Sequence, residues 1–240
     1  MVSSGADDFL QSAELYDAIY HFKNYQREGE YLRNLIDRIV PHAQTLLDVA
    51  CGTGEHAGFL KQYYSVDGVD LNEKYLEAAR RKNPRGTYRR ADMTNFDLGF
   101  RYDVVTCLFS AIGYVRTASF AARAIACMAQ HVRPGGSLIV EPWFTPERWK
   151  PGTVTINSGE TNDGLVCRMA LSHRQDSLAV ISLHYLHGTR QSVRYYKEQL
   201  ELGLFTEEEM VWSFEHAGMH VVHEPTGLIG RGLYIGTFPP

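Results

Sequence analysis

The chain has 240 residues, of which 44% are hydrophobic, and it carries 24 Lys and Arg against 28 Asp and Glu. This length predicts one large α/β domain, or one domain with a small subdomain, and a net charge of −4 argues against a nucleic-acid partner. The apolar runs are strand-length, residues 1–8 are polar and acidic, and the four cysteines form no C-x-x-C pair, so we expect a cytoplasmic protein without membrane contact, metal site or disulfides.

The N-terminal part is predicted to be helical. Residues 9–40 are rich in aromatic side chains, and Leu32, Leu35, Ile36 and Ile39 recur at helical spacing before Pro41 ends the run. We treat residues 1–40 as a separate helical segment that precedes the core.

Strands and helices then alternate, which predicts a doubly wound parallel sheet. The strands are expected near residues 45–50, 66–70, 87–90, 103–109 and 137–141, and the helices near 55–63, 73–82 and 118–131. Arg133-Pro134-Gly135-Gly136 is expected to form a turn into the fifth strand.

The pattern changes between residues 151 and 204. Alternating apolar residues from about position 153, broken by turn signals such as Asn162-Asp163-Gly164, predict an inserted antiparallel β meander. A helix at about 207–217 ends at Gly218, and two last strands surround Val221-Val222 and residues 233–236. The predicted core therefore comprises residues 41–150 and 205–240, and its closing antiparallel hairpin is the Rossmann-like ending of class I methyltransferases.

The loop after the first strand carries the most informative motif, Asp48-Val49-Ala50-Cys51-Gly52-Thr53-Gly54. Glycine allows positive φ and close approach of a ligand to the backbone, and the following helix points its free amides toward that ligand. Asp48 stands just before the loop and is expected to orient the cationic end of a cofactor.

Two further acids follow later strands. Asp70 ends the second strand and fits an acceptor for two ribose hydroxyls. Asp92, with Met93 beside it, fits an adenine contact made by a carboxylate and a thioether. This ordered set predicts a pocket for S-adenosylmethionine, and therefore methyl transfer.

A nicotinamide dinucleotide is the competing ligand. Residues 52–57 satisfy the pattern G-x-G-x-x-G/A, and Asp70 lies at about the right distance. Against this, Asp48 would face a pyrophosphate, Asp92 has no role, and a dinucleotide fold would end with another parallel strand.

With these elements placed, the sequence resembles the sugar N,N-dimethyltransferases that complete dTDP-linked dideoxyamino sugars. The resemblance covers nearly the whole chain. Its matching stretches are Tyr16-Asp17-x-x-Tyr20, Leu46 to Gly54, Leu108 to Tyr114, Pro134-Gly135-Gly136, Val140-Glu141-Pro142-Trp143, Ser172-His173 and Gly230-Arg231-Gly232-Leu233.

The resemblance implies roles for named residues. The N-terminal segment would form a lid over the cofactor, and the meander would shape the acceptor site and contribute a homodimer contact. Trp143, His173 and Arg231 would face the acceptor, and the planar fork of Arg231 suits a diphosphate. The cofactor-binding set would be Tyr20, Lys23, Tyr25, Asp48, Ala50, Cys51, Gly52, Gly54, Asp70, Leu71, Asp92, Met93, Leu108, Phe109 and Ser110.

The expected reaction is in-line attack of a neutral amine on the sulfonium methyl, with S-adenosylhomocysteine as product. Tyr20, Tyr114 and His173 are candidates to orient the amine or accept its proton, although positioning alone contributes about 7–11 kcal/mol. The nearest alternative acceptor is another small amine or hydroxyl metabolite. A nicotinamide-dependent oxidoreductase and a catalytically silent binding protein are the more distant alternatives.

Overall fold

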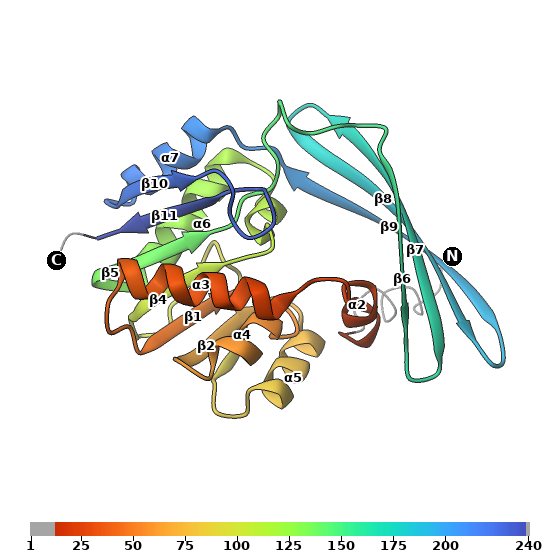
Figure 1. Cartoon of the computed structure of the whole chain (residues 1–240). Coiled ribbons are helices and arrows are strands. Elements are labelled where there is room, and N and C mark those ends of the chain that lie inside the picture. Colours follow the sequence, from red (N-terminus) through yellow and green to blue (C-terminus); the bar gives the residue numbers. More distant parts are fainter. Residues whose placement is uncertain (1–12, 239–240) are drawn as a thin grey trace.

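The computed structural model describes residues 13–238 and contains two β-sheets (Figure 1). The larger sheet has seven strands in the order β10-β11-β5-β4-β1-β2-β3. Its pairs from β5 to β3 are parallel, whereas β11 runs antiparallel to both β5 and β10. Its strands are β1 (Thr45–Val49), β2 (Ser65–Asp70), β3 (Tyr88–Arg90), β4 (Tyr102–Cys107), β5 (Val132–Val140), β10 (His220–Glu224) and β11 (Leu233–Thr237). The predicted class I methyltransferase architecture is confirmed.

Helices cover both faces of this sheet because side chains alternate along each strand. Leu46 packs on the face that holds α3 (Tyr25–Ile39), α4 (Glu55–Leu60) and α5 (Glu73–Lys82). Leu47, its neighbour on β1, packs with α6 (Ala118–Gln130) and α7 (Glu207–His216). The central strands are thereby buried on both sides, and their carboxyl ends meet at one edge.

Several predicted boundaries differ from the structure. The N-terminal helical segment is divided into α2 (Ala13–Ile19) and α3, because Asn24 caps α3 by accepting a hydrogen bond from the Arg27 amide at 2.9 Å. Residues 1–12, which include the start of that predicted segment, lie outside the described residues. The predicted 133–136 turn lies within β5, whose pairing with β4 shifts register between Tyr102 and Val104, and a 3-10 helix, η1 (Ala111–Val115), follows β4.

The inserted meander forms a separate four-stranded antiparallel sheet, as predicted. Its strands are β6 (Val154–Glu160), β7 (Gly164–Gln175), β8 (Leu178–Thr189) and β9 (Val193–Gly203), paired in chain order. Helix α2 packs against it through Ile19 and Val166. In Figure 1 this sheet stands to the right of the larger sheet, and α2 lies between the two.

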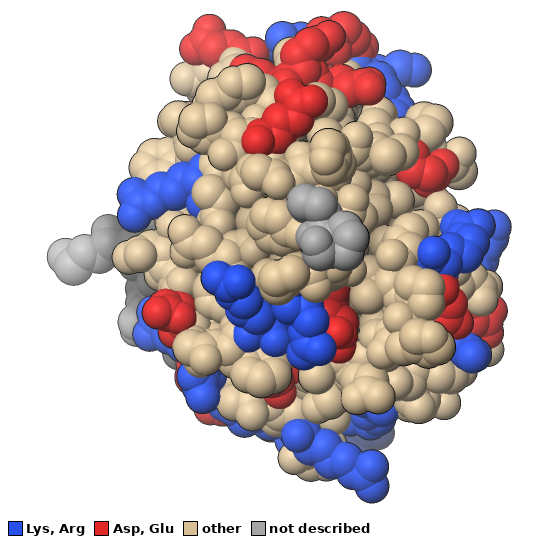
Figure 2. All heavy atoms as spheres, turned by 90° about the vertical axis from the view of Figure 1, so that its left-hand side faces the viewer, with Lys and Arg blue, Asp and Glu red and all other residues tan. Residues whose placement is uncertain are grey.

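The surface charge is mixed. Figure 2 shows acidic side chains gathered at the top of one face, at the height of α7, and separate groups of Lys and Arg below. The first turn of α7 carries Glu207, Glu208 and Glu209. Among residues 13–238, no helix has the length and hydropathy required to cross a bilayer.

Candidate active site

A cavity of about 1830 Å³ lies between the carboxyl edge of the seven-stranded sheet, α2 and the inner face of the four-stranded sheet. It brings together most of the predicted site residues. Those that line it are Tyr20, Lys23, Tyr25, Asp48, Ala50, Cys51, Gly52, Asp70, Leu71, Met93, Leu108, Phe109, Ser110, Tyr114, Trp143 and Arg231. Gly54, Asp92 and His173 lie outside the lining.

The loop after β1 has the backbone that its glycines predict. Gly52 and Gly54 have φ values of 55° and 79°, and Ala50 adopts 56°. A Cβ on Gly54 would lie 2.8 Å from the Cβ of Ala79, so glycine at this position lets α4 and α5 approach. A Cβ on Gly52 would meet no atom within 4 Å. Gly52 therefore leaves open space beside the cavity.

Asp48 is a buried carboxylate in the cavity wall, and only 3% of its surface is exposed. Its Oδ1 accepts a hydrogen bond from the Thr106 hydroxyl at 3.0 Å. Burial raises the pKa of Asp48 to about 6, against the opposing effects of His56 and Thr106. A cation bound in the cavity would favour the ionised form, so Asp48 fits the predicted cationic end of the cofactor.

Asp70 is held by the glycine loop and by its own turn. Its Oδ2 accepts from the Gly52 amide at 2.9 Å, and its Oδ1 accepts from the Asn72 amide at 2.8 Å. Burial raises its pKa, and these amide contacts oppose the shift. Each carboxylate oxygen retains a second lone pair, so the oriented carboxylate can still accept two ribose hydroxyls.

The third predicted acid is placed differently. Asp92 is exposed, and its Oδ1 accepts from both the amide and the hydroxyl of Thr94 at 2.8 Å. Met93 lines the cavity, but the Asp92 side chain does not. The adenine contact of Asp92 stays a prediction, and in this geometry it would require the side chain to leave its turn.

Lys23 and Phe109 lie close together in the cavity wall, beyond the end of β4. The Lys23 Nζ lies 3.8 Å from the centre of the Phe109 ring and 3.0 Å from Glu28 Oε2, which also contacts His56 Nε2 at 2.8 Å. Burial lowers the pKa of Lys23, and Glu28 opposes that shift. Phe109 and Ser110 have φ values of 52° and 60°, a backbone strain of the kind that is concentrated at functional sites.

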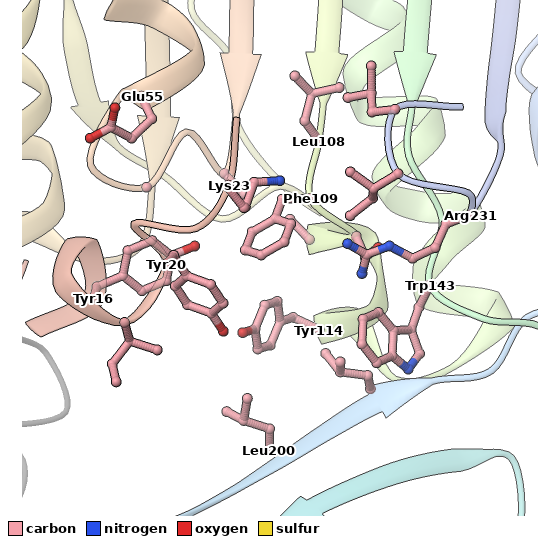
Figure 3. A pocket seen from close by; sticks show the side chains of 18 of the residues that line it. Tyr16, Tyr20, Lys23, Glu55, Leu108, Phe109, Tyr114, Trp143, Leu200 and Arg231 are labelled. Atoms are coloured by element: carbon pink, nitrogen blue, oxygen red, sulfur yellow. The ribbon is translucent and has the colours of Figure 1, made fainter. Parts of the chain in front are cut away.

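Glu141 was not predicted as a site residue, although it lies in the Glu-Pro-Trp stretch. It is fully buried at the end of β5, and its Oε2 accepts from the Phe109 amide at 2.6 Å. Its Oε1 has no hydrogen-bond partner and lies 3.7 Å from Arg231 Nε. Glu141 thus joins the strained loop to Arg231, whose guanidinium lies 5.0 Å from the Trp143 ring (Figure 3).

The cavity residues on the four-stranded sheet were also not predicted from the sequence. Arg168, a buried residue on β7, donates from Nη1 to the Tyr20 hydroxyl at 2.9 Å and from Nη2 to Asn157 at 3.2 Å. On the neighbouring strands, the Tyr185 hydroxyl donates to Glu198 at 3.2 Å. Period-two alternation in residues 164–203 places these residues on one face, but it does not say which face meets the cavity.

His173, predicted to be both catalytic and acceptor-facing, is exposed on β7, and its carbonyl accepts a hydrogen bond from Trp149 Nε1 at 2.8 Å. Its neighbour Ser172 lines the cavity instead. Successive strand residues point to opposite faces, so the role of His173 stays a prediction that this geometry does not favour. Trp143 packs against Phe144 and Trp149, with ring centres 4.9 Å and 5.7 Å apart.

The cavity fits a nucleoside with a cationic tail. It combines a buried carboxylate, an oriented strand-end carboxylate, an open glycine loop and a strained turn in one continuous space. Figure 3 shows the rings of Tyr16, Tyr20 and Tyr114 around the same space, with Phe109 between Lys23 and Arg231. Within residues 13–238, no group of three His, Cys, Asp or Glu side chains has the geometry of a metal site.

Comparison with known proteins agrees with this geometry. A family described as a methyltransferase domain matches residues 46–136. The dTDP-3-amino-3,6-dideoxy-alpha-D-glucopyranose N,N-dimethyltransferase of Streptomyces fradiae is 38% identical, over 96% of this chain and 92% of its own.

Two solved structures are also similar. DesVI of Streptomyces venezuelae superposes with a TM-score of 0.89 at 32% identity, over 95% of this chain and 98% of its own. CalS10 of Micromonospora echinaspora is described as an amino pentose methyltransferase in calicheamicin biosynthesis and was solved with S-adenosylmethionine bound. It superposes with a TM-score of 0.83 at 31% identity, over 99% of this chain and 97% of its own.

Proposed function

We propose that this chain, which belongs to the family of dTDP-amino-sugar N,N-dimethyltransferases, transfers methyl groups from S-adenosylmethionine to the amine of a nucleotide-linked amino sugar. It is an S-adenosylmethionine-dependent methyltransferase. One observation carries the proposal: a single cavity joins the strand-end carboxylates Asp48 and Asp70 to an aromatic wall that contains Arg231.

The cofactor-facing residues divide by the part of the molecule they suit. Asp70 would accept the ribose hydroxyls, and Met93 would contact the adenine. Asp48, Lys23 and Tyr25 would surround the methionyl end, where Glu28 balances the charge of Lys23. S-adenosylmethionine supplies the activated methyl group when bound, and S-adenosylhomocysteine is the proposed product.

The protein's own contribution is positioning and exclusion of water. Phe109, Ser110 and Tyr20 would fix the amine in line with the methyl group, and a correctly oriented bound pair gains about 7–11 kcal/mol over free reactants. The cavity wall is largely aromatic near Tyr20 and Tyr114. Such surroundings disfavour the ammonium form and so favour the neutral, nucleophilic amine.

Arg231 is the proposed contact for the diphosphate of the acceptor. Its guanidinium is buried between Phe109 and Trp143, at 5.4 Å and 5.0 Å from their ring centres. Glycines on both sides of it give φ values of 81° and 91° and let the loop present the side chain. Glu141 balances its charge before a phosphate arrives.

A homodimer is proposed from the outer face of the four-stranded sheet. The following apolar side chains on that sheet are about half or more exposed: Val154, Ile156, Leu165, Met169, Leu186, Val193 and Tyr195. Their cross-strand register, for example Cys167 with Leu186 and Leu186 with Tyr195, places them on one surface. Contiguous exposed apolar surface of this kind is typical of protein interfaces.

The biological setting is proposed from the relatives. The similarity to a calicheamicin-biosynthesis enzyme supports a role in secondary metabolism. A cytoplasmic location stays a prediction that cell fractionation would check.

Binding calorimetry tests the proposed function. We expect heats of binding for both S-adenosylmethionine and dTDP, with dTDP affinity about 10- to 100-fold weaker in Arg231→Ala because a charge-assisted phosphate contact is lost. The matched control is Arg190→Ala, an exposed arginine between β8 and β9. Binding of S-adenosylmethionine without dTDP would favour another small amine or hydroxyl acceptor, and absence of S-adenosylmethionine binding would contradict the proposal.

A further inference from the structure

Each transfer of a methyl group to an amine leaves a proton on the nitrogen that must be removed before the next transfer. The nitrogen lone pair forms the new N–C bond, and the C–S bond breaks with its electrons left on sulfur. The nitrogen is then an ammonium and must lose a proton before it can attack again. In a water-poor aromatic cavity that proton needs an acceptor.

Glu198 is placed to accept it. Among the cavity-lining residues contributed by β6, β7, β8 and β9, Glu198 is the one carboxylate and Arg168 is the one cation. Glu198 is half-buried on β9 and makes no ion pair within 4 Å in the described chain. Of the other acids that line the cavity, Glu28 contacts Lys23 and His56, Glu55 pairs with Lys82, and Asp70 accepts hydrogen bonds from backbone amides.

Neighbouring groups hold the Glu198 carboxylate toward the cavity. The Tyr185 hydroxyl donates to its Oε2 at 3.2 Å, and Arg168 lies directly opposite Tyr185 in the β7–β8 register. Arg168 is buried and donates to the Tyr20 hydroxyl at 2.9 Å, while its Nε has no partner. A chain of polar groups therefore runs from Tyr20, which packs edge-on against Phe109 at 5.1 Å, to Glu198.

The charge environment agrees with this arrangement. The titratable groups that face Glu198 are Tyr185 on β8, Arg168 on β7, Tyr75 on α5 and Tyr114 on η1. Burial raises the pKa of Glu198, and the hydrogen bond from Tyr185 and the charge of Arg168 limit that rise. The carboxyl group is thereby shifted toward the range in which a base can take and return a proton.

We propose that Glu198 accepts the amine proton in each methylation, with Tyr185 and Arg168 as positioning residues; this rests on the proposed amino-sugar activity. The N–H bond breaks with its electron pair retained on nitrogen, and the proton passes to the carboxylate and then to solvent. Glu198 thereby resets the amine for the second methyl.

The first test measures how many protons are released when the sugar nucleotide binds, in the absence of turnover. Binding of dTDP-3-amino-3,6-dideoxyglucose in the presence of S-adenosylhomocysteine is measured by calorimetry in two buffers of different ionisation enthalpy. We expect Glu198→Gln to release up to one proton more per sugar bound than the wild type, because no carboxylate remains to take it or pair with the ammonium. Glu201→Gln, which removes a carboxylate from the same strand outside the cavity lining, should match the wild type.

The second test follows products and pH. Glu198→Gln should lower kcat at neutral pH by about 100-fold, accumulate monomethylated product and recover as pH rises and water deprotonates the amine. Glu198→Asp retains a carboxylate and should recover part of the rate, which separates proton transfer from packing. A Glu198→Gln variant with the wild-type proton count, product ratio and pH profile would overturn the inference, whereas a wild type that methylates no amino sugar would overturn the proposed function and the inference with it.

Discussion

At the residue scale, Asp48, the proposed contact for the cationic end of the cofactor, lowers the stability of the fold at neutral pH because its carboxylate is buried. Its pKa in the cofactor-free protein is about 6, above the ordinary value of 3.8. Between about pH 4 and 6 the unfolded chain has released a proton that the folded chain retains, so this group's contribution to stability is present at low pH and is lost as pH rises to 6. The site therefore holds an ionised acid at pH 7 at the expense of stability.

Asp48→Asn should raise the free energy of unfolding at pH 7 by up to about 3 kcal/mol, measured by urea unfolding without cofactor. The same change should weaken S-adenosylmethionine binding by about 10- to 100-fold, because a buried charge-assisted contact is lost. Glu77→Gln, at an exposed position on α5, is the control and should change neither quantity. Reduced stability together with unchanged affinity would contradict this role.

Glu141 is predicted to stabilise two buried cations, Arg231 and Lys23, whose charges both act on its carboxylate. Glu141→Gln would leave Arg231 without its carboxylate, and breaking a buried pair costs about 3–5 kcal/mol. We therefore expect a lower midpoint in urea, with dTDP affinity equal to or higher than that of the wild type, since Arg231 loses its competing partner. Glu215→Gln on the exposed side of α7 serves as the control. A variant as stable as the wild type would show that Glu141 is not charged in the folded protein.

Residues near the glycine motif could be predicted because they follow one another in sequence at strand ends. Asp48, Gly52 and Asp70 all reach the cavity for this reason. Arg168 could not be found in this way, because its partner Tyr20 is 148 positions away. Asp92 shows a different limit of sequence-based prediction. It follows β3 as predicted, but its carboxylate accepts a hydrogen bond from Thr94 in a local turn and does not line the cavity.

At the scale of elements, Asp17 links α2 to the glycine loop after β1. Asp17 accepts from the Thr53 hydroxyl at 2.6 Å and from Lys82 Nζ at 2.7 Å. This links the proposed lid to both the glycine loop and α5. The lid should open more readily when these contacts weaken.

Asp17→Asn should therefore increase the dissociation rate of S-adenosylmethionine by about 5- to 30-fold, which corresponds to about 1–2 kcal/mol for two exchanged hydrogen bonds. Stopped-flow displacement by S-adenosylhomocysteine measures this rate. Glu30→Gln, an exposed change on α3, should leave it unaffected. An unchanged dissociation rate in Asp17→Asn would show that α2 does not control exit.

The elements themselves were largely predictable, since hydrophobic alternation and turn signals mark both sheets. The orientation of the four-stranded sheet was not. Its outer face carries apolar residues such as Ile156 and Leu186, and its inner face carries Ala170 and Leu183. A strand that is apolar on both faces does not indicate which one meets the core, and so Glu198 and Tyr185 were missed.

At the scale of the whole molecule, that outer face predicts self-association. We expect the wild type to sediment at twice the chain mass of 27.2 kDa. Leu186→Asp should sediment as a monomer, because it places a charge among Cys167 and Tyr195 at the centre of the apolar face. Val222→Asp, a change at an exposed position on β10, should remain dimeric. A monomeric wild type would remove the dimer from the proposed function.

The arrangement of the two sheets would allow one cavity to hold both proposed ligands. The seven-stranded sheet contributes acids suited to a nucleoside, and the four-stranded sheet closes the other side with aromatic and polar side chains. Neither sheet encloses the reacting centre alone. The proposed activity therefore depends on both facing the same space.

The most direct measurement is the mass of the product formed from S-adenosylmethionine and dTDP-3-amino-3,6-dideoxyglucose. We expect the sugar nucleotide to gain one and then two methyl units, with an equal amount of S-adenosylhomocysteine released. A sugar nucleotide whose mass is unchanged, in a sample that demonstrably binds both ligands, would contradict the assignment of this enzyme to amino-sugar N-methylation.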